Sequence, residues 1–479
     1  MTAEICVHDQ LREHWRQLTS SEPGAPAIDW LGELISFQEL AERVALEQAH
    51  LERLIPAGGS GSGARVGVRI GDGPANLVSG FALMLAAIPQ AILPITATPA
   101  EQERLERRLG LSHRLDASTP PTQGPWICLG QLPSGVSCWQ HSAPGQAEPD
   151  DPADPAVFLG TTSGTTSAVP TVIRMRAKAV LAPANPHSPY LKVRAPLLGE
   201  GLQNWSARLY KLLTLFHNRR IVIRSLDHPF QPGTIPAHCD GMPMPPDMLR
   251  VHLAWNDLCH CPEGFLLISG SDRVPMALRQ AVVASGPVRL GITYATSQSG
   301  PLTWLPPEAV LDERESVGWP IPGVGLEPTG PVRYAEGGLS FREVIVRTPG
   351  YNPFNPGDLL AISASGQVIF GGRSNDVFLF ASLLISPFEI EEVLSQHPAV
   401  EHCVAFGARS DRYGGVPMAA VRLRPGHDAS AALAELDRIA RASLGARRPR
   451  RILELDSFPE GPTGKPLRRV LSDRFALQG

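Results

Sequence analysis

The sequence has no excess of basic residues: 43 Lys and Arg stand against 47 Asp and Glu among 479 residues, for a formal net charge of −4. A dedicated nucleic-acid binder carries a clear basic surplus, so nucleic acid is not an expected partner. Cysteine is also scarce. Seven cysteines, an odd number, cannot form a complete disulfide framework, and we expect a reducing compartment, the cytoplasm.

A long apolar run is missing as well. The N-terminal segment is charged from the outset, unlike a signal peptide. The most apolar stretch, residues 80–95, is interrupted by Pro89, Gln90 and Pro94. It is shorter than the ~20 residues that span a bilayer. We therefore expect no membrane span, and instead a buried helix that leads into a buried strand.

Proline, by contrast, is abundant, with 47 residues where a share of about 5% is usual. Many of these prolines lie in a polar loop at residues 140–155 and in the connection at 225–247. Hydrophobic residues make up 43% of the chain, enough for a sizeable core. At roughly 150 residues per domain, the length predicts two to four folding units.

Helical and strand patterns alternate through the first part of the chain. Ser36 followed by Glu39 is a capping-box pattern and predicts a helix over residues 36–54. Further expected elements are strands at 65–70, 91–95, 220–224, 265–269 and 288–294 and a helix at 76–87. This alternation is typical of a layered α/β domain.

The C-terminal part of the sequence shows a different pattern of predicted secondary structure. Residues 327–370 predict short strands joined by Gly and Pro turns, a β-rich subdomain. After these come an expected helix (387–396), two strands (401–406 and 417–423) and a helix (429–444). We therefore predict a large N-terminal domain, residues 1–372, and an α+β domain of about 100 residues, 373–479.

Five segments carry residue types suited to phosphate chemistry. They are FLGTTSGTTSAVPTVIR (158–174), GITYATSQSG (291–300), NPGDLLAI (355–362), residues 371–400 and FPEGPTGKPLRR (458–469). In the first, glycine, exposed N–H groups and hydroxyls can surround a phosphate. Taken singly, Asp358 is as well explained as a turn cap, Arg373 as a surface charge and Lys465 as a solvated residue.

In this order, the five segments resemble the motifs of the adenylate-forming superfamily. Its members include acyl- and aryl-CoA ligases, adenylation domains of nonribosomal peptide synthetases, and luciferases. The resemblance covers essentially the whole chain and is strongest in residues 316–470. It implies an N-terminal domain that binds ATP and a carboxylic acid, and a small mobile C-terminal cap.

The resemblance implies a role for each matching residue. The loop that would surround the ATP phosphates consists of Thr162, Ser163, Gly164, Thr165 and Thr166. Tyr294 would line the adenine site, and Ser297 would place a hydroxyl near the phosphates. Asp358 would bind the ribose hydroxyls, and Arg373 would also reach the nucleotide.

Two further residues belong to the cap by this resemblance. Asp376 lies at the hinge about which the cap would rotate. Lys465 would bridge the carboxylate and the α-phosphate during adenylation, where positioning and charge neutralisation dominate catalysis. The implied cofactors are ATP and Mg²⁺, and the implied acceptor is CoA or the phosphopantetheine of an acyl or peptidyl carrier protein.

The sequence departs from the family pattern at three places. Thr171 replaces the lysine that usually ends the phosphate loop. Gln298 replaces the metal-binding glutamate, and a neutral amide is a weaker metal ligand. Ser382 replaces a glycine of the tunnel for the incoming thiol.

The acid itself is poorly determined. Residues 196–216 lack the Phe-Asp motif that holds an α-ammonium group, which argues against an ordinary α-amino acid. By position, the residues of the acid pocket are Trp205, Ile268, Ser269 and Gly270. A small aryl or medium-sized apolar acid is expected.

We therefore expect an AMP-forming acid–thiol ligase that forms an acyl-adenylate and transfers the acyl group to a thiol, with a role in secondary-metabolite biosynthesis. One alternative transfers the acyl group to an amine, as amide-forming relatives do, and Ser382 motivates it. Another is a non-catalytic nucleotide-binding homologue, which Thr171 and Gln298 favour and Lys465 opposes.

Overall fold

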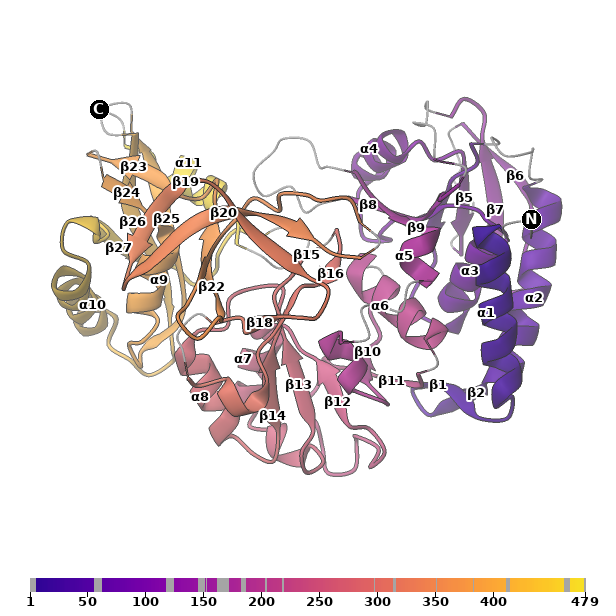
Figure 1. Ribbon diagram of the computed structural model, residues 1–479, viewed down its shortest axis with the longest axis horizontal. Coiled ribbons are helices and arrows are strands. Elements are labelled where there is room, and N and C mark those ends of the chain that lie inside the picture. The colour runs from indigo at the N-terminus through magenta and orange to yellow at the C-terminus, as the bar shows by residue number, and fades with distance from the viewer. Residues whose placement is uncertain are drawn as a thin grey trace. The chain divides into compact units, whose positions relative to one another are not determined.

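The computed structural model divides the chain into two compact units, one ending at Pro243 and the other formed by Met244–Gly479 (Figure 1). The structure describes residues 6–55, 63–117, 125–144, 151, 153–161, 172–181, 187–202, 205–217, 219–296, 298–312, 316–349, 351–381, 383–410, 414–460 and 466–477.

The first unit is built around two sheets. Its elements are α1 (Val7–Ser21), β1 (Pro26–Trp30), β2 (Glu33–Ser36), α2 (Phe37–Leu54), β3 (Val66–Arg69), α3 (Pro74–Leu85), β4 (Gln90–Ile92), α4 (Pro99–Leu109), β5 (His113–Asp116), β6 (Trp126–Gln131), β7 (Ser137–His141), β8 (Ala156–Thr161), β9 (Val172–Arg176), α5 (Ala177–Leu181), the 3-10 helix η2 (Pro189–Lys192), β10 (Leu197–Gly199), α6 (Trp205–Phe216), β11 (Ile221–Arg224) and β12 (Gly241–Pro243). The larger sheet has the order β6-β7-β5-β3-β4-β8-β9, and the other β10-β11-β1-β2.

The expected α/β alternation is confirmed in this unit. Strands β5, β3, β4 and β8 run parallel at the centre of the larger sheet. The helix expected from the capping pattern is α2, and the Ser36 hydroxyl accepts a hydrogen bond from the Glu39 N–H at 3.1 Å. The apolar stretch forms α3, which is buried along almost its whole length, followed by β4, as expected. Helices α1, α2 and α3 contribute to one large apolar core.

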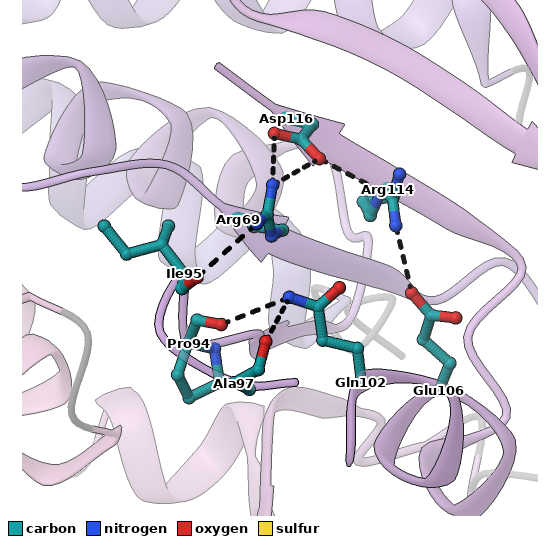
Figure 2. A network of polar contacts seen from close by, with 8 residues as sticks. All are labelled: Arg69, Pro94, Ile95, Ala97, Gln102, Glu106, Arg114 and Asp116. Carbon is teal, nitrogen blue, oxygen red and sulfur yellow. Dashed lines mark hydrogen bonds and ion pairs between the residues drawn. The ribbon is translucent and has the colours of Figure 1, made fainter. Parts of the chain in front are cut away.

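An ion-pair network lies at the carboxyl ends of β3 and β5 (Figure 2). Arg69 and Asp116 are register partners at these ends, and Arg69 Nη1 donates to both carboxylate oxygens at 3.2 Å. Arg114 Nε lies 3.3 Å from Asp116 Oδ2, and Arg114 Nη1 lies 3.4 Å from Glu106 Oε1 on α4. Asp116 is 1% exposed, so its charge depends on these two guanidinium groups.

The second unit combines a short parallel pair of strands with an antiparallel sheet and a mixed sheet. Its elements are α7 (Pro246–Trp255), η3 (Leu258–His260), β13 (Leu266–Ser269), α8 (Met276–Ala284), β14 (Arg289–Ile292), β15 (Ala295–Thr296), β16 (Gly300–Pro301), β17 (Thr303–Trp304), η4 (Pro307–Ala309), β18 (Trp319–Pro320), β19 (Gly325–Glu336), β20 (Leu339–Arg347), β21 (Asp358–Ile362), β22 (Val368–Arg373), β23 (Phe378–Phe380), β24 (Leu383–Ile385), α9 (Pro387–Leu394), β25 (Val400–Ser410), β26 (Gly414–Leu423), α10 (Ala429–Leu444), η5 (Gly445–Arg447), β27 (Arg451–Glu454) and α11 (Arg468–Arg474).

The sheets of this unit agree with the expected change from alternating helices and strands to short strands joined by turns. The order β19-β20-β21-β22 forms the β-rich subdomain, and β24-β23-β26-β25, with β27 beside β26, forms the C-terminal sheet. The expected C-terminal helices and strands are α9, β25, β26 and α10. The mixed α/β and α+β fold class is therefore confirmed. The boundary between residues 372 and 373 falls inside the second unit and stays a prediction.

Two expectations drawn from composition concern cysteines and membrane spans. All seven cysteines lie in the described ranges, and each is a free thiol. Of the helices that the structure describes, none combines the length and the apolar character needed to cross a bilayer.

The Asp116 network generates a stability prediction. Asp116→Ala leaves two arginines without their buried carboxylate, and breaking a buried pair costs about 3–5 kcal/mol. We expect a loss of that size in the free energy of unfolding, measured by urea titration. The matched control is Glu103→Ala, which removes the exposed ion pair with Arg107 and costs under ~1 kcal/mol. Similar losses in the two variants would contradict the importance of the network.

Candidate nucleotide site

The pairing of β21 with β22 brings Asp358 and Arg373 together. Asp358 begins β21, Arg373 ends β22, and the two are register partners. Arg373 Nε lies 3.0 Å from Asp358 Oδ1. The turn before β21 requires Gly357, whose φ is +75°, and the Asn355 side chain accepts the Gly357 N–H at 2.7 Å. The sequence Asn-Pro-Gly-Asp thus places a carboxylate at the start of a strand.

Tyr294 completes this group from a distant part of the chain. It follows β14, and its hydroxyl donates to Asp358 Oδ2 at 2.5 Å. Its backbone N–H donates to Thr303 Oγ1 at 3.0 Å, which fixes the residue. Burial raises the pKa of the Tyr294 phenol well above its ordinary value, and the negative charge of Asp358 raises it further. The phenol therefore stays protonated and acts as a donor.

Asp358 is consequently a buried carboxylate that contacts Tyr294 through Oδ2 and Arg373 through Oδ1. It is 3% exposed, whereas the Arg373 side chain is 46% exposed. Each carboxylate oxygen can accept two hydrogen bonds. The chemistry of this carboxylate fits the two adjacent hydroxyls of a ribose.

An aromatic layer supports the group. The Tyr294 and Phe370 ring centroids are 5.9 Å apart, and the Phe370 and Phe388 rings meet edge to face at 5.6 Å. Tyr294 also belongs to an apolar cluster with residues of β20, β21 and β22. Such surroundings exclude water and strengthen the charged hydrogen bonds.

Glu343 on β20 joins the turn before Asp358 to the segment after Arg373, and sequence reasoning did not find it. Glu343 Oε1 accepts from Ser374 Oγ at 2.5 Å, and Oε2 accepts from Asn355 Nδ2 at 2.7 Å. The bond from Ser374 and then that from Asn355 lower the pKa of Glu343. Because the contact joins segments far apart in sequence, no local pattern signals it.

The predicted hinge residue lies in a turn directly after β22. The Asp376 N–H donates to the Arg373 carbonyl at 3.1 Å, and the Ser374 N–H donates to the Gly357 carbonyl at 2.9 Å. The start of the predicted hinge is therefore tied to the Asp358 turn.

The turn after Tyr294 provides only neutral side-chain groups as ligands for a metal ion, among the residues that the structure describes. Thr296 Oγ1 and Ser299 Oγ lie 2.9 Å apart, and the Gln298 side chain is exposed. A neutral amide beside these hydroxyls fits a Mg²⁺ ion that takes most of its ligands from phosphates and water.

Three of the predicted acid-pocket residues are placed next to this turn. Ile268 and Ser269 end β13 and are buried, beside the end of β14 in a parallel pair. The Thr293 N–H donates to the Ser269 carbonyl at 2.9 Å. A Cβ on Gly270 would lie 2.5 Å from the Thr293 carbonyl oxygen, so the close approach requires glycine. Ligands commonly bind beyond the carboxyl ends of parallel strands.

The side chains of the remaining predicted residues lie outside the described part of the chain. Trp205 begins α6, but its side chain is outside the described part. The residues that lie outside the described ranges altogether are Thr162, Ser163, Gly164, Thr165, Thr166, Thr171, Ser297, Ser382 and Lys465.

Comparisons with known proteins agree with the sequence motifs. Residues 389–465 match the AMP-binding enzyme C-terminal domain. Over 109 residues the chain is 38% identical to 4-chlorobenzoate–CoA ligase of Pseudomonas sp. (strain CBS-3). This matched segment makes up 22% of this chain and 20% of that ligase. Over 120 residues it is 37% identical to a fatty acid–[acyl-carrier-protein] ligase of Streptomyces coeruleorubidus, covering 25% and 23%. The match thus spans about a fifth to a quarter of each relative.

The fold likeness extends much further than the sequence likeness. The O-succinylbenzoate coenzyme A synthetase of Bacillus subtilis, solved with ATP and magnesium, superposes with a TM-score of 0.76 at 18% identity. The superposition covers 96% of this chain and 99% of that one. The chain therefore has the same fold as this solved enzyme, and residues 389–465 match the AMP-binding enzyme C-terminal domain. The resemblance found in the sequence motifs is confirmed.

The buried phenol generates a second prediction. Tyr294→Phe removes a hydrogen bond to a charged acceptor, which is worth about 1.5–3 kcal/mol, against about 0.5–1.5 kcal/mol for a neutral one. The matched control is Tyr334→Phe, which removes a bond to the Gly371 carbonyl. Urea unfolding should show the larger loss for Tyr294→Phe. Equal or reversed losses would mean that Asp358 does not depend on the phenol.

Proposed function

We propose that the protein activates a carboxylic acid with ATP and then transfers the acyl group to a thiol of CoA or of a carrier-protein phosphopantetheine. In the first step an oxygen of the acid forms a bond to the α-phosphorus of ATP. The bond to the bridging oxygen breaks, and pyrophosphate leaves. In the second step the thiol sulfur attacks the acyl carbon and its proton is released to solvent. The bond between that carbon and the phosphate oxygen breaks, and AMP leaves. The observation that carries this proposal is the Tyr294–Asp358–Arg373 group within an adenylate-forming fold.

The geometry of this group supports nucleotide binding. Asp358, held by Tyr294 and Arg373, would accept hydrogen bonds from the ribose hydroxyls. The exposed side of the Arg373 guanidinium would attract the phosphates, since arginine is always charged and presents several donors. Tyr294 would pack its ring against the adenine.

The reaction needs positive charge, because two anions must approach each other. Mg²⁺ bound to the phosphates would neutralise part of the charge of ATP, with the exposed Gln298 amide as a neutral ligand from this chain. Lys465 would supply a further charge at the acid and the α-phosphate. It is the last residue of the segment that matches the AMP-binding enzyme C-terminal domain.

The acid class is supported by the pocket residues and by one relative. Ile268 and Gly270 offer an apolar wall without a charge for an α-ammonium group. The similarity to 4-chlorobenzoate–CoA ligase supports an aryl acid. The similarity to a ligase that acts on an acyl-carrier protein keeps a carrier protein among the acceptors.

A change at Asp358 tests nucleotide binding. Asp358→Asn keeps an acceptor but loses the charge that strengthens its hydrogen bonds, so we expect AMP to bind about 10- to 100-fold more weakly. Isothermal titration calorimetry without acid measures this affinity. Asp227→Asn, at an exposed aspartate, should leave it unchanged. An unchanged affinity in Asp358→Asn would remove the carboxylate from the site.

A change at Lys465 tests catalysis. We expect Lys465→Ala to slow acid-dependent exchange of labelled pyrophosphate into ATP by about 10²–10³-fold, as for other electrostatic stabilisers of a transition state. Lys178→Ala, at an exposed lysine of α5, is the control. A Lys465→Ala variant with the full exchange rate would contradict the assignment.

The same assay separates the alternatives. A non-catalytic homologue would bind AMP but exchange no pyrophosphate with any acid of an aryl and alkyl panel. If exchange occurs, the product formed with CoA, with a holo-carrier protein or with an amine identifies the acceptor. A product with the amine alone would favour the amide-forming alternative.

A further inference from the structure

Arg468, the first residue of α11, connects three other parts of the C-terminal region. Its Nη2 donates to Glu391 Oε1 on α9 at 2.7 Å. Its Nε donates to the Ala405 carbonyl on β25 at 3.2 Å. Its Nη1 lies 3.5 Å from Oδ2 of Asp376, the predicted hinge residue. One guanidinium therefore joins a helix, a strand and the hinge turn.

The contact with Glu391 fixes the orientation of the guanidinium. Glu391 is 4% exposed, and its Oε1 also accepts the Ala405 N–H at 2.8 Å. A buried carboxylate needs a hydrogen-bonded cation, and arginine provides a planar and rigid set of donors. Because Ala405 contacts both side chains, Arg468 is held by backbone and side-chain partners together.

The backbone around Arg468 is fixed as well. The Leu467 N–H donates to the Pro459 carbonyl at 2.7 Å, and Pro466 forms a bridge with Glu460. Ser472 Oγ donates to the Gly407 carbonyl at 2.6 Å, which ties α11 to β25. Lys465 is bonded directly to Pro466, so its attachment point belongs to this fixed region.

We propose that Arg468 is a positioning residue for the adenylation step. It holds the attachment point of Lys465 in a defined relation to Asp376, so that rotation about the hinge brings the lysine to the nucleotide. Arg468 acts through Lys465 and contacts neither substrate. This inference rests on the proposed function, in which Lys465 serves acyl-adenylate formation.

The expected effect is confined to one half-reaction. A misplacement of about 1 Å can cost on the order of 100-fold in rate, so Arg468→Met should slow pyrophosphate exchange about 10- to 100-fold. Thioester formation from acyl-AMP that is supplied ready-made should stay within about 2-fold of wild type, because Lys465 does not act in it. AMP affinity, which depends on Asp358, should not change.

Further variants distinguish a loss of positioning from a loss of folding. Arg468→Met leaves the Glu391 carboxylate without its cation, whereas the double variant Arg468→Met with Glu391→Gln removes that buried charge and should show the same loss of exchange. Arg469→Met, at the exposed neighbouring arginine, is the matched control and should keep the wild-type rate. Arg468→Lys should recover part of the exchange activity.

A double-mutant cycle tests whether Arg468 acts through Lys465. In a Lys465→Ala background, Arg468→Met should cause no further loss of exchange. The same fold-loss in both backgrounds, or equal losses in both half-reactions, would overturn the inference. A wild-type protein without acid-dependent exchange would overturn the proposed function itself. Wild-type exchange that persists unchanged in Arg468→Met would overturn only the role of Arg468.

Discussion

The buried carboxylate of Asp358 is the constraint around which the candidate site is built. A charge that is 3% exposed is costly unless it is fully hydrogen-bonded. The register of β21 and β22 supplies Arg373, and the segment after β14 supplies Tyr294. Strand register and a distant segment of the chain together therefore fix the position of this carboxylate.

The same constraint links the site to the predicted cap. Arg373 ends β22, and the segment that follows is tied to the Asp358 turn by Ser374 and Glu343. Asp376, three residues after Arg373, contacts Arg468 of α11. Polar contacts thus connect the Asp358 turn with Arg468 of α11.

Local patterns in the sequence predicted much of the fold. The Ser36 cap located α2, the apolar stretch located α3, and the change to short strands joined by Gly and Pro turns after residue 327 located the antiparallel sheet. Contacts between distant segments were beyond such patterns. Tyr294 and Asp358 are 64 positions apart, and Glu343 and Arg468 act through partners on other elements. The hairpin of β6 and β7 has an irregular register and mostly polar or half-buried residues, so no alternation indicated it.

The most direct test of nucleotide binding at Asp358 is a crystal structure with a non-hydrolysable ATP analogue. We expect the ribose hydroxyls to lie within hydrogen-bond distance of the Asp358 carboxylate, with the adenine against Tyr294 and Arg373 directed at the phosphates. A nucleotide bound elsewhere, or an Asp358 carboxylate that keeps only its protein partners when the nucleotide is bound, would contradict it.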